Sequence, residues 1–175
     1  MSTVFMIALG VVMALGGVHL KSRYLSFSAQ RPSDYADQQP VFDIRQELNG
    51  PILCEGVIYG PTGRVASRFV ADMDAKWEGN VCRMAEAFKY DSGNTQDREW
   101  VLTLGNDGGI RADAADLVGR GSGMQEGSAV VLNYNIRLPA DSGGHVLAVT
   151  DWMYLTPNGT IINRSQFRKF GIKVA

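Results

Sequence analysis

The chain of 175 residues begins with an apolar stretch and continues as a body in which apolar and polar positions alternate. Met1–Leu20 contains no Asp, Glu, Lys or Arg, and Val4–Leu20 is almost entirely apolar and small side chains. As a helix this segment reaches roughly 25 Å, slightly less than the hydrocarbon core of a bilayer, about 30 Å. His19 and Tyr24 can make up the difference at the interface. The pattern predicts one transmembrane anchor helix over residues 1–22.

A cleaved signal peptide is the alternative for the same segment. A signal peptide begins with basic residues, whereas here they follow the span, at Lys21, Arg23 and Arg31. Their position favours a retained anchor, with the body on the cytoplasmic side by the positive-inside bias. Ser26-Phe27-Ser28 is compatible with cleavage, so removal of residues 1–28 and a periplasmic body stay open.

Small residues recur on one face of the predicted anchor helix. Gly10, Ala14 and Gly17 are spaced by four and three residues, which places them on one side of a helix. Such a face lets a second transmembrane helix approach closely. The alternative is that these small residues are ordinary members of a hydrophobic span and have no role in helix packing.

The residues after the span change in character twice. Residues 23–50 are polar and lack a hydrophobic period, so we expect a tether, in which Val41–Leu48 can form a short helix. From residue 51 to 175 the period is two, as in Arg64–Trp77 and Val130–Leu138, which is typical of half-buried antiparallel strands. Glycine-containing turns separate the runs. The spacing predicts an all-β domain of about eight or nine antiparallel strands, closed into a barrel because a barrel leaves no long edge unpaired.

Composition narrows the classes of function. From Asp34 onward the chain has 14 basic and 18 acidic residues, a net charge of -4, which argues against nucleic-acid binding. The two cysteines, Cys54 and Cys82, and the two histidines lack the spacing of a metal site. We therefore expect no metal and no cofactor.

One inward-facing carboxylate stands out among apolar neighbours. Glu86 lies on the face of Asn80–Tyr90 that also carries Cys82, Met84 and Phe88. If Asp91-Ser92-Gly93 forms a three-residue turn with Gly93 in the left-handed region, Arg98 on the next strand lies directly opposite. A buried carboxylate needs such a partner, so we predict an internal ion pair. A ligand anchor and a general acid are the alternatives.

A second polar set lies near strand ends and consists of Asp116, Asp151, Asn163 and Arg164. Two carboxylates within reach of one another can support acid–base chemistry. The spacing does not place them together, so a salt-bridged barrel mouth is the preferred interpretation.

A succession of short motifs runs from about residue 50 to the end: Glu55-Gly56, Gly63-Arg64-Val65, Arg68-Phe69, Trp77-Glu78-Gly79, Glu86-Ala87-Phe88, Tyr90-Asp91, Arg98-Glu99-Trp100, Ala115-Asp116-Leu117-Val118-Gly119, Asp151-Trp152-Met153, Asn163-Arg164 and Lys169-Phe170-Gly171. By these motifs the region resembles an uncharacterised bacterial family, known only as a domain of unknown function and regarded as lipocalin-like. The resemblance implies a lipocalin-like barrel and no specific reaction. Many members resemble exported lipoproteins, but this chain has no Cys before Cys54 and therefore no lipobox. We expect a single-pass protein of the bacterial inner membrane.

Three functions follow from these observations. The preferred one is a non-catalytic, membrane-anchored accessory subunit whose span packs on partner helices of other membrane-protein subunits and whose barrel docks on a larger complex. The alternative is a lipocalin-like carrier or sensor of a small apolar ligand or lipid. An enzyme using Glu86, or Asp116 with Asp151, is the third. Against a ligand cavity stand the bulky side chains expected on inward faces: Phe69, Trp77, Phe88, Trp100, Tyr134 and Trp152.

Overall fold

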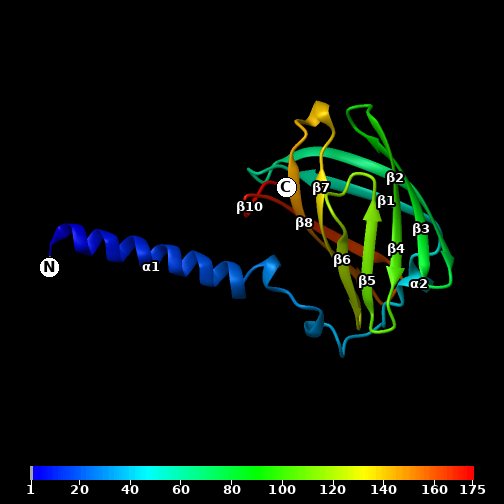
Figure 1. Cartoon of the computed structure of the whole chain (residues 1–175), viewed down its shortest axis with the longest axis horizontal. Helices are drawn as coiled ribbons and strands as arrows, with labels where there is room; N and C mark the ends of the chain where they lie inside the picture. Colours follow the sequence, from blue (N-terminus) through cyan, green and yellow to red (C-terminus); the bar gives the residue numbers. More distant parts are fainter. Residues whose placement is uncertain (1) are drawn as a thin grey trace.

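The computed structural model describes residues 2–175, apart from the side chains of Ser22 and Asp141. Its first element is α1 (Thr3–Tyr24), which projects away from the rest of the molecule (Figure 1). Ser2 caps the helix by accepting a hydrogen bond from the backbone N–H of Phe5. The segment Thr3–Lys21 is long and apolar enough to cross a membrane, a test that a signal sequence also passes, and none of it is buried.

After α1 the chain runs along the outside of a sheet. Two short 3-10 helices, η1 (Phe27–Ala29) and η2 (Pro32–Asp34), are followed by the four-residue helix α2 (Ile44–Glu47). The side chains of Phe42 and Ile44 are fully buried in the core of the sheet. This segment is therefore packed against the body along part of its length.

The body is one antiparallel sheet of ten strands that pair in the order of the chain, and it curls into a half-barrel (Figure 1). The all-β antiparallel fold is confirmed, with slightly more strands than the eight or nine expected. The ladder runs from β1 to β10, which are its two outer strands, so the expected closure is replaced by an open curl. The strands are β1 (Gly50–Tyr59), β2 (Val65–Glu78), β3 (Val81–Tyr90), β4 (Thr95–Leu104), β5 (Gly109–Ala114), β6 (Gly121–Glu126), β7 (Ala129–Arg137), β8 (Val146–Leu155), β9 (Ile161–Lys169) and β10 (Ile172–Lys173), with a 3-10 helix, η3 (Ala140–Ser142), between β7 and β8.

The concave face of the half-barrel holds the main core. Alternate residues of the central strands point inward, as the period of two predicts. Trp77 closes one end of this core, where its indole N–H donates to the carbonyl of Leu48 at 2.8 Å. The largest buried side chains of this core are Phe42, Ile44, Met84, Trp100, Leu102, Leu104, Ile110, Leu132, Tyr134 and Leu155.

A second, smaller cluster lies on the outer face of β6–β8. Trp152, which is 2% exposed, packs there with Ala129 and Val131, and the tether side chains Phe27 and Tyr35 lie against it. The expectation that Trp152 points inward is wrong. Its neighbour Asp151 occupies the inward position, and burial of Trp152 comes from the tether instead of the barrel interior.

Candidate functional site

Glu86 and Arg98 face each other on the concave side of the half-barrel. Gly93 has φ of 87° in the β3–β4 turn, and the ladder pairs Glu86 with Arg98 directly. Arg98 Nη1 lies 3.8 Å from Glu86 Oε2, and the two side chains are 12% and 7% exposed. The distance is long for a hydrogen bond, and Glu86 Oε2 has no hydrogen-bond partner.

The closer partner of Arg98 is Asp116. Arg98 Nε donates to Asp116 Oδ2 at 2.8 Å and Nη2 donates to Oδ1 at 3.2 Å, so the guanidinium is held at two points. Asp116 lies in the β5–β6 connection, which is fixed to β7 because the N–H of Arg137 donates to the Asp116 carbonyl. Arg98 therefore bridges two carboxylates from different parts of the chain.

Aromatic rings cover the faces of the guanidinium. The Arg98 guanidinium carbon lies 4.1 Å from the ring centre of Trp100 and 5.9 Å from that of Tyr134. The two rings meet edge to face at 5.1 Å. This packing limits the access of water to the Arg98 charge and favours cation–π contact.

Asp151 extends the same cluster on β8. It accepts hydrogen bonds from Asn163 Nδ2 at 2.6 Å, from the Ser165 hydroxyl at 2.8 Å and from the Tyr134 hydroxyl at 3.5 Å. Tyr134 thus connects Asp151 to the aromatic surroundings of Arg98. Five of the six polar residues singled out from the sequence, Glu86, Arg98, Asp116, Asp151 and Asn163, lie on one concave surface, which we call the Arg98 cluster together with Tyr134 and Ser165.

Arg164 lies apart from this cluster. As the residue next to Asn163 in β9 it points to the outer face, where its guanidinium carbon lies 4.7 Å from the ring centre of Phe27. The predicted second polar set is therefore divided between the two faces of the sheet.

The helix-packing face predicted on α1 is exposed along its length. Gly10, Ala14 and Gly17 all lie on exposed parts of α1. A methyl group added at Gly10 or Gly17 would meet nothing within 4 Å, so this face is open to another helix.

Burial changes the protonation of the Arg98 cluster. It raises the pKa of Glu86 from its ordinary value of 4.5 to about 7, against the opposing effect of Arg98. Burial also raises the pKa of Asp151, although Asn163 and Ser165 hydrogen bonds to its carboxylate act in the opposite direction. Glu86 therefore keeps its proton to higher pH than an exposed glutamate does, and in the protonated form its carboxyl group can donate a hydrogen bond.

Cys54, Tyr134 and Ser165 belong to the site but were not identified as site residues from the sequence. Strand alternation alone places Tyr134 and Ser165 on the inward face, so that signal was present. The half-buried Cys54 lies across the concavity on β1, and burial together with the charges of Glu86 and Asp151 raises the pKa of its thiol. A raised thiol pKa disfavours the thiolate and hence nucleophilic catalysis.

The described residues, 2–175, contain no group of three or more His, Cys, Asp or Glu side chains arranged to hold a metal ion. Two open cavities, of about 310 and 550 Å³, lie on the outer face where the tether meets the sheet. Gln30 lines both of them. Their lining residues include none from the Arg98 cluster.

Comparison with known proteins gives a match to a family model. No curated protein and no solved structure matches the chain. The family match covers residues 22–175, which include the tether and the whole sheet and leave out most of α1. The chain therefore belongs to the family described as protein of unknown function, DUF3833.

Proposed function

We propose that this protein is a non-catalytic, membrane-tethered binding protein whose concave sheet face takes an amphipathic ligand such as a lipid. The single observation that carries the proposal is Glu86 Oε2, a buried oxygen without a hydrogen-bond partner beside Arg98. Buried polar atoms are nearly always satisfied, so an orphan of this kind suggests a group that a ligand supplies.

The surroundings of Glu86 suit the apolar part of such a ligand. Phe69 and Phe88 meet edge to face at 5.3 Å, and Phe88 stacks on Tyr90 at 6.1 Å. The three rings are half-buried and lie on the concave side of β2 and β3. Gly56 on β1 makes room for them, because a Cβ there would collide with the ring of Phe69.

The charges of the Arg98 cluster indicate the polar end of the ligand. The Arg98 guanidinium lies among the carboxyl groups of Glu86, Asp116 and Asp151. It already donates two hydrogen bonds to Asp116. A carboxylate ligand would meet repulsion from Asp116 and Asp151. A neutral head group that exchanges hydrogen bonds with Glu86, such as an alcohol or a glyceride, fits better.

The tether and α1 support a location at the membrane surface. α1 has the length and composition of a span, and Lys21 and Arg23 follow at its end. The positive-inside bias favours the cytoplasmic side for the sheet, as expected from the sequence.

The test is a titration of the full-length protein in mild detergent with a monoacylglycerol brominated in its chain. We expect quenching of tryptophan fluorescence, and weaker quenching in Trp100→Phe, because Trp100 lines the cluster. Phe88→Ala should weaken binding roughly tenfold, since losing an aromatic contact surface costs on the order of 1.5 kcal/mol. Val70→Ala, the same kind of truncation on the outer face of β2, is the control. Equal quenching in Phe88→Ala and the native protein would exclude the concave site.

A second candidate function is an accessory subunit of a membrane complex. The observation in its favour is the unoccupied face of Gly10, Ala14 and Gly17 on α1. A close helix–helix contact there would hold the sheet beside a membrane partner. This function and ligand binding are compatible, because they use different parts of the molecule.

A further inference from the structure

We propose that the tip of the β9–β10 hairpin, Lys169–Lys173, is a second membrane contact that inserts into the headgroup region of an anionic bilayer. This inference rests on the proposed anchoring by α1 and adds a docking surface on the sheet itself. It assigns a function to the most exposed large apolar side chain among residues 2–175.

That side chain is Phe170, which is 93% exposed, and Ile172 beside it is 69% exposed. Phe170 has φ of 50°, the only left-handed conformation found at a non-glycine position in the described part of the chain. A bulky residue in this region is unusual, and such backbone outliers concentrate at functional positions. Because Phe170 has almost no contact surface within the protein, its ring does not serve the core.

The hairpin holds Phe170 in this exposed position. Ile172 pairs with Lys169 and Lys173 pairs with Arg168, while the N–H of Val174 donates to the carbonyl of Phe167 at 2.9 Å. Arg168 Nη1 also donates to the Gly171 carbonyl at 3.4 Å. The tip is therefore ordered on both sides.

Charge identifies the partner. From Trp152 to the end the chain carries four basic residues, Arg164, Arg168, Lys169 and Lys173, and no acidic side chain, although the body as a whole is acidic. Lys169 Nζ lies 5.7 Å from the ring centre of Phe170. An exposed aromatic ring between lysines matches the boundary of an anionic membrane, where the ring enters the interface and the ammonium groups meet phosphates.

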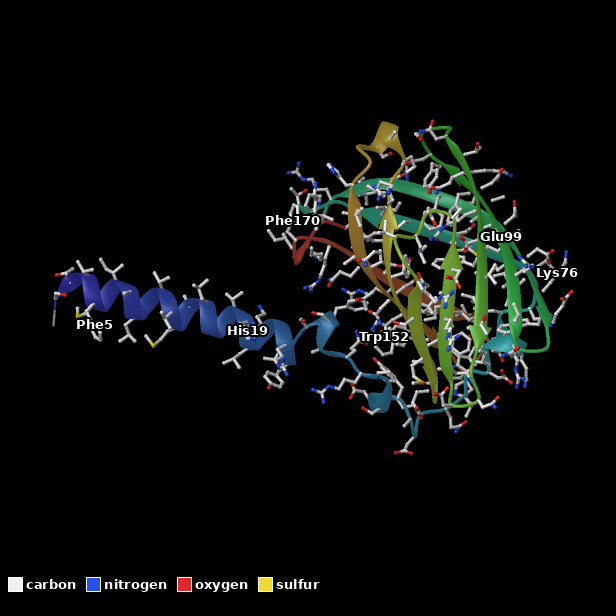
Figure 2. All side chains as sticks on the ribbon, viewed as in Figure 1. Phe5, His19, Lys76, Glu99, Trp152 and Phe170 are labelled. Carbon is white, nitrogen blue, oxygen red and sulfur yellow. The ribbon has the colours of Figure 1, made fainter. Side chains whose placement is uncertain are left out.

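The position of Phe170 in the molecule also fits a membrane as its partner. Phe170 lies on the side of the sheet from which α1 projects, whereas Lys76 lies at the opposite end of the molecule (Figure 2). A bilayer crossed by α1 therefore faces Phe170. Arg23 and Tyr24 at the end of α1 repeat the pairing of a cation with an aromatic ring, at 5.9 Å.

The test places an environment-sensitive fluorophore on the full-length protein in vesicles. The label is attached at Phe170→Cys in a Cys54→Ala background, in which the buried Cys82 stays unlabelled. Lys76→Cys, an exposed position far from α1, is the matched control. Vesicles contain phosphatidylcholine alone or with phosphatidylglycerol, and flotation reports whether α1 is inserted.

We expect the label at position 170 to shift to shorter wavelength and to react several-fold more slowly with a water-soluble quencher in the anionic vesicles. The label at position 76 should not change. Lys169→Gln with Lys173→Gln should abolish the preference for phosphatidylglycerol, whereas Lys76→Gln with Lys89→Gln should preserve it.

Protein that floats while position 170 behaves like position 76 would overturn the hairpin contact and leave the anchor intact. Protection of position 170 in native membranes but not in pure lipid would assign the tip to a protein partner and overturn the lipid contact. Failure to float would overturn the anchor and the hairpin contact with it.

Discussion

Arg98 is the residue on which the polar side chains of the concave face converge. Asp116 holds the guanidinium at two points, and Trp100 covers one of its faces at 4.1 Å. Glu86 is the weaker partner, because its Oε2 lies 3.8 Å from Arg98 Nη1. This buried oxygen has no hydrogen bond that would offset its loss of contact with water. The result is a carboxyl group that titrates near neutral pH instead of near 4.5.

A raised carboxyl pKa predicts a defined dependence of stability on pH. The folded protein binds the Glu86 proton more tightly than the unfolded chain does, so stability falls as pH rises from 4.5 to about 7. At about 1.4 kcal/mol per pKa unit, the loss from this group is about 3 kcal/mol. Glu86→Gln removes the titration, so its stability relative to the native protein should increase across that pH range.

Urea unfolding of the full-length protein in detergent, followed between pH 4.5 and pH 8, measures this difference. Glu99→Gln is the matched control, because Glu99 lies on the adjacent position to Arg98 in β4 but is exposed and pairs with Arg83. It should leave the pH dependence unchanged. A pH dependence of Glu86→Gln that parallels the native protein would show that Glu86 does not titrate in this range.

At the scale of elements, the tether is part of the folded body. Tyr35 packs on Trp152 with ring centres 5.2 Å apart and on Tyr154 at 5.5 Å. Gln30 accepts hydrogen bonds from the hydroxyls of Tyr35 and Tyr154. The family match, which begins at residue 22, includes this segment with the sheet.

Gly127 decides how closely the tether approaches the sheet. Its φ is 50°, and a Cβ there would collide with the backbone carbonyl of Tyr35. We expect Gly127→Ala to displace the tether and to speed cleavage after Tyr35 by chymotrypsin several-fold. Gly159→Ala is the control: Gly159 has φ of 82°, but a methyl group added there meets nothing within 4 Å. This variant therefore carries only the backbone cost of a left-handed alanine, roughly 1–2 kcal/mol, without a collision. Equal cleavage of the two variants would mean that the tether is not held at Gly127.

The exposed small-residue face of α1 gives a separate prediction about partners. Replacing Gly10 and Gly17 with Leu adds bulk where another helix would approach, so a membrane partner should no longer co-purify in mild detergent. Val12→Leu changes the opposite face of the same helix and should preserve co-purification. Retention of every co-purifying protein by the double variant would exclude helix packing through this face.

At the scale of the whole molecule, charge and apolar surface are arranged in zones along the chain. An apolar helix, a basic segment, an acidic body and a basic C-terminal hairpin follow one another. α1 projects from the side of the sheet on which Phe170 lies (Figures 1 and 2). This arrangement suits a protein held with one side against a membrane.

Anchoring requires that the apolar helix stays attached to the mature protein. We expect the intact mass of the protein purified from native membranes to include residues 1–28, and alkaline carbonate to leave it in the membrane pellet. The basic residues Lys21 and Arg23 after the apolar stretch are the reason why we expect the helix to be retained. A mature N-terminus near Ala29 would identify the helix as a signal sequence instead.

The sequence by itself determined the features that depend on neighbours along the chain. The period of two marked the strands, and the single apolar run marked α1, because both patterns reflect which side of an element faces water. The position of Arg98 opposite Glu86 could also be predicted from the sequence, because a short turn containing Gly93 sets the register of the hairpin.

Only the tertiary structure decided which distant groups meet. Arg98 and Trp100 on β4 meet Tyr134 on β7, and through Tyr134 they are connected to Asp151 on β8, because the sheet curls. Trp152 is buried on the outer face because the tether covers it, which strand alternation cannot show. Sheet curvature and tether docking arise from contacts between residues far apart in sequence. A local pattern of apolar and polar positions contains no information about them.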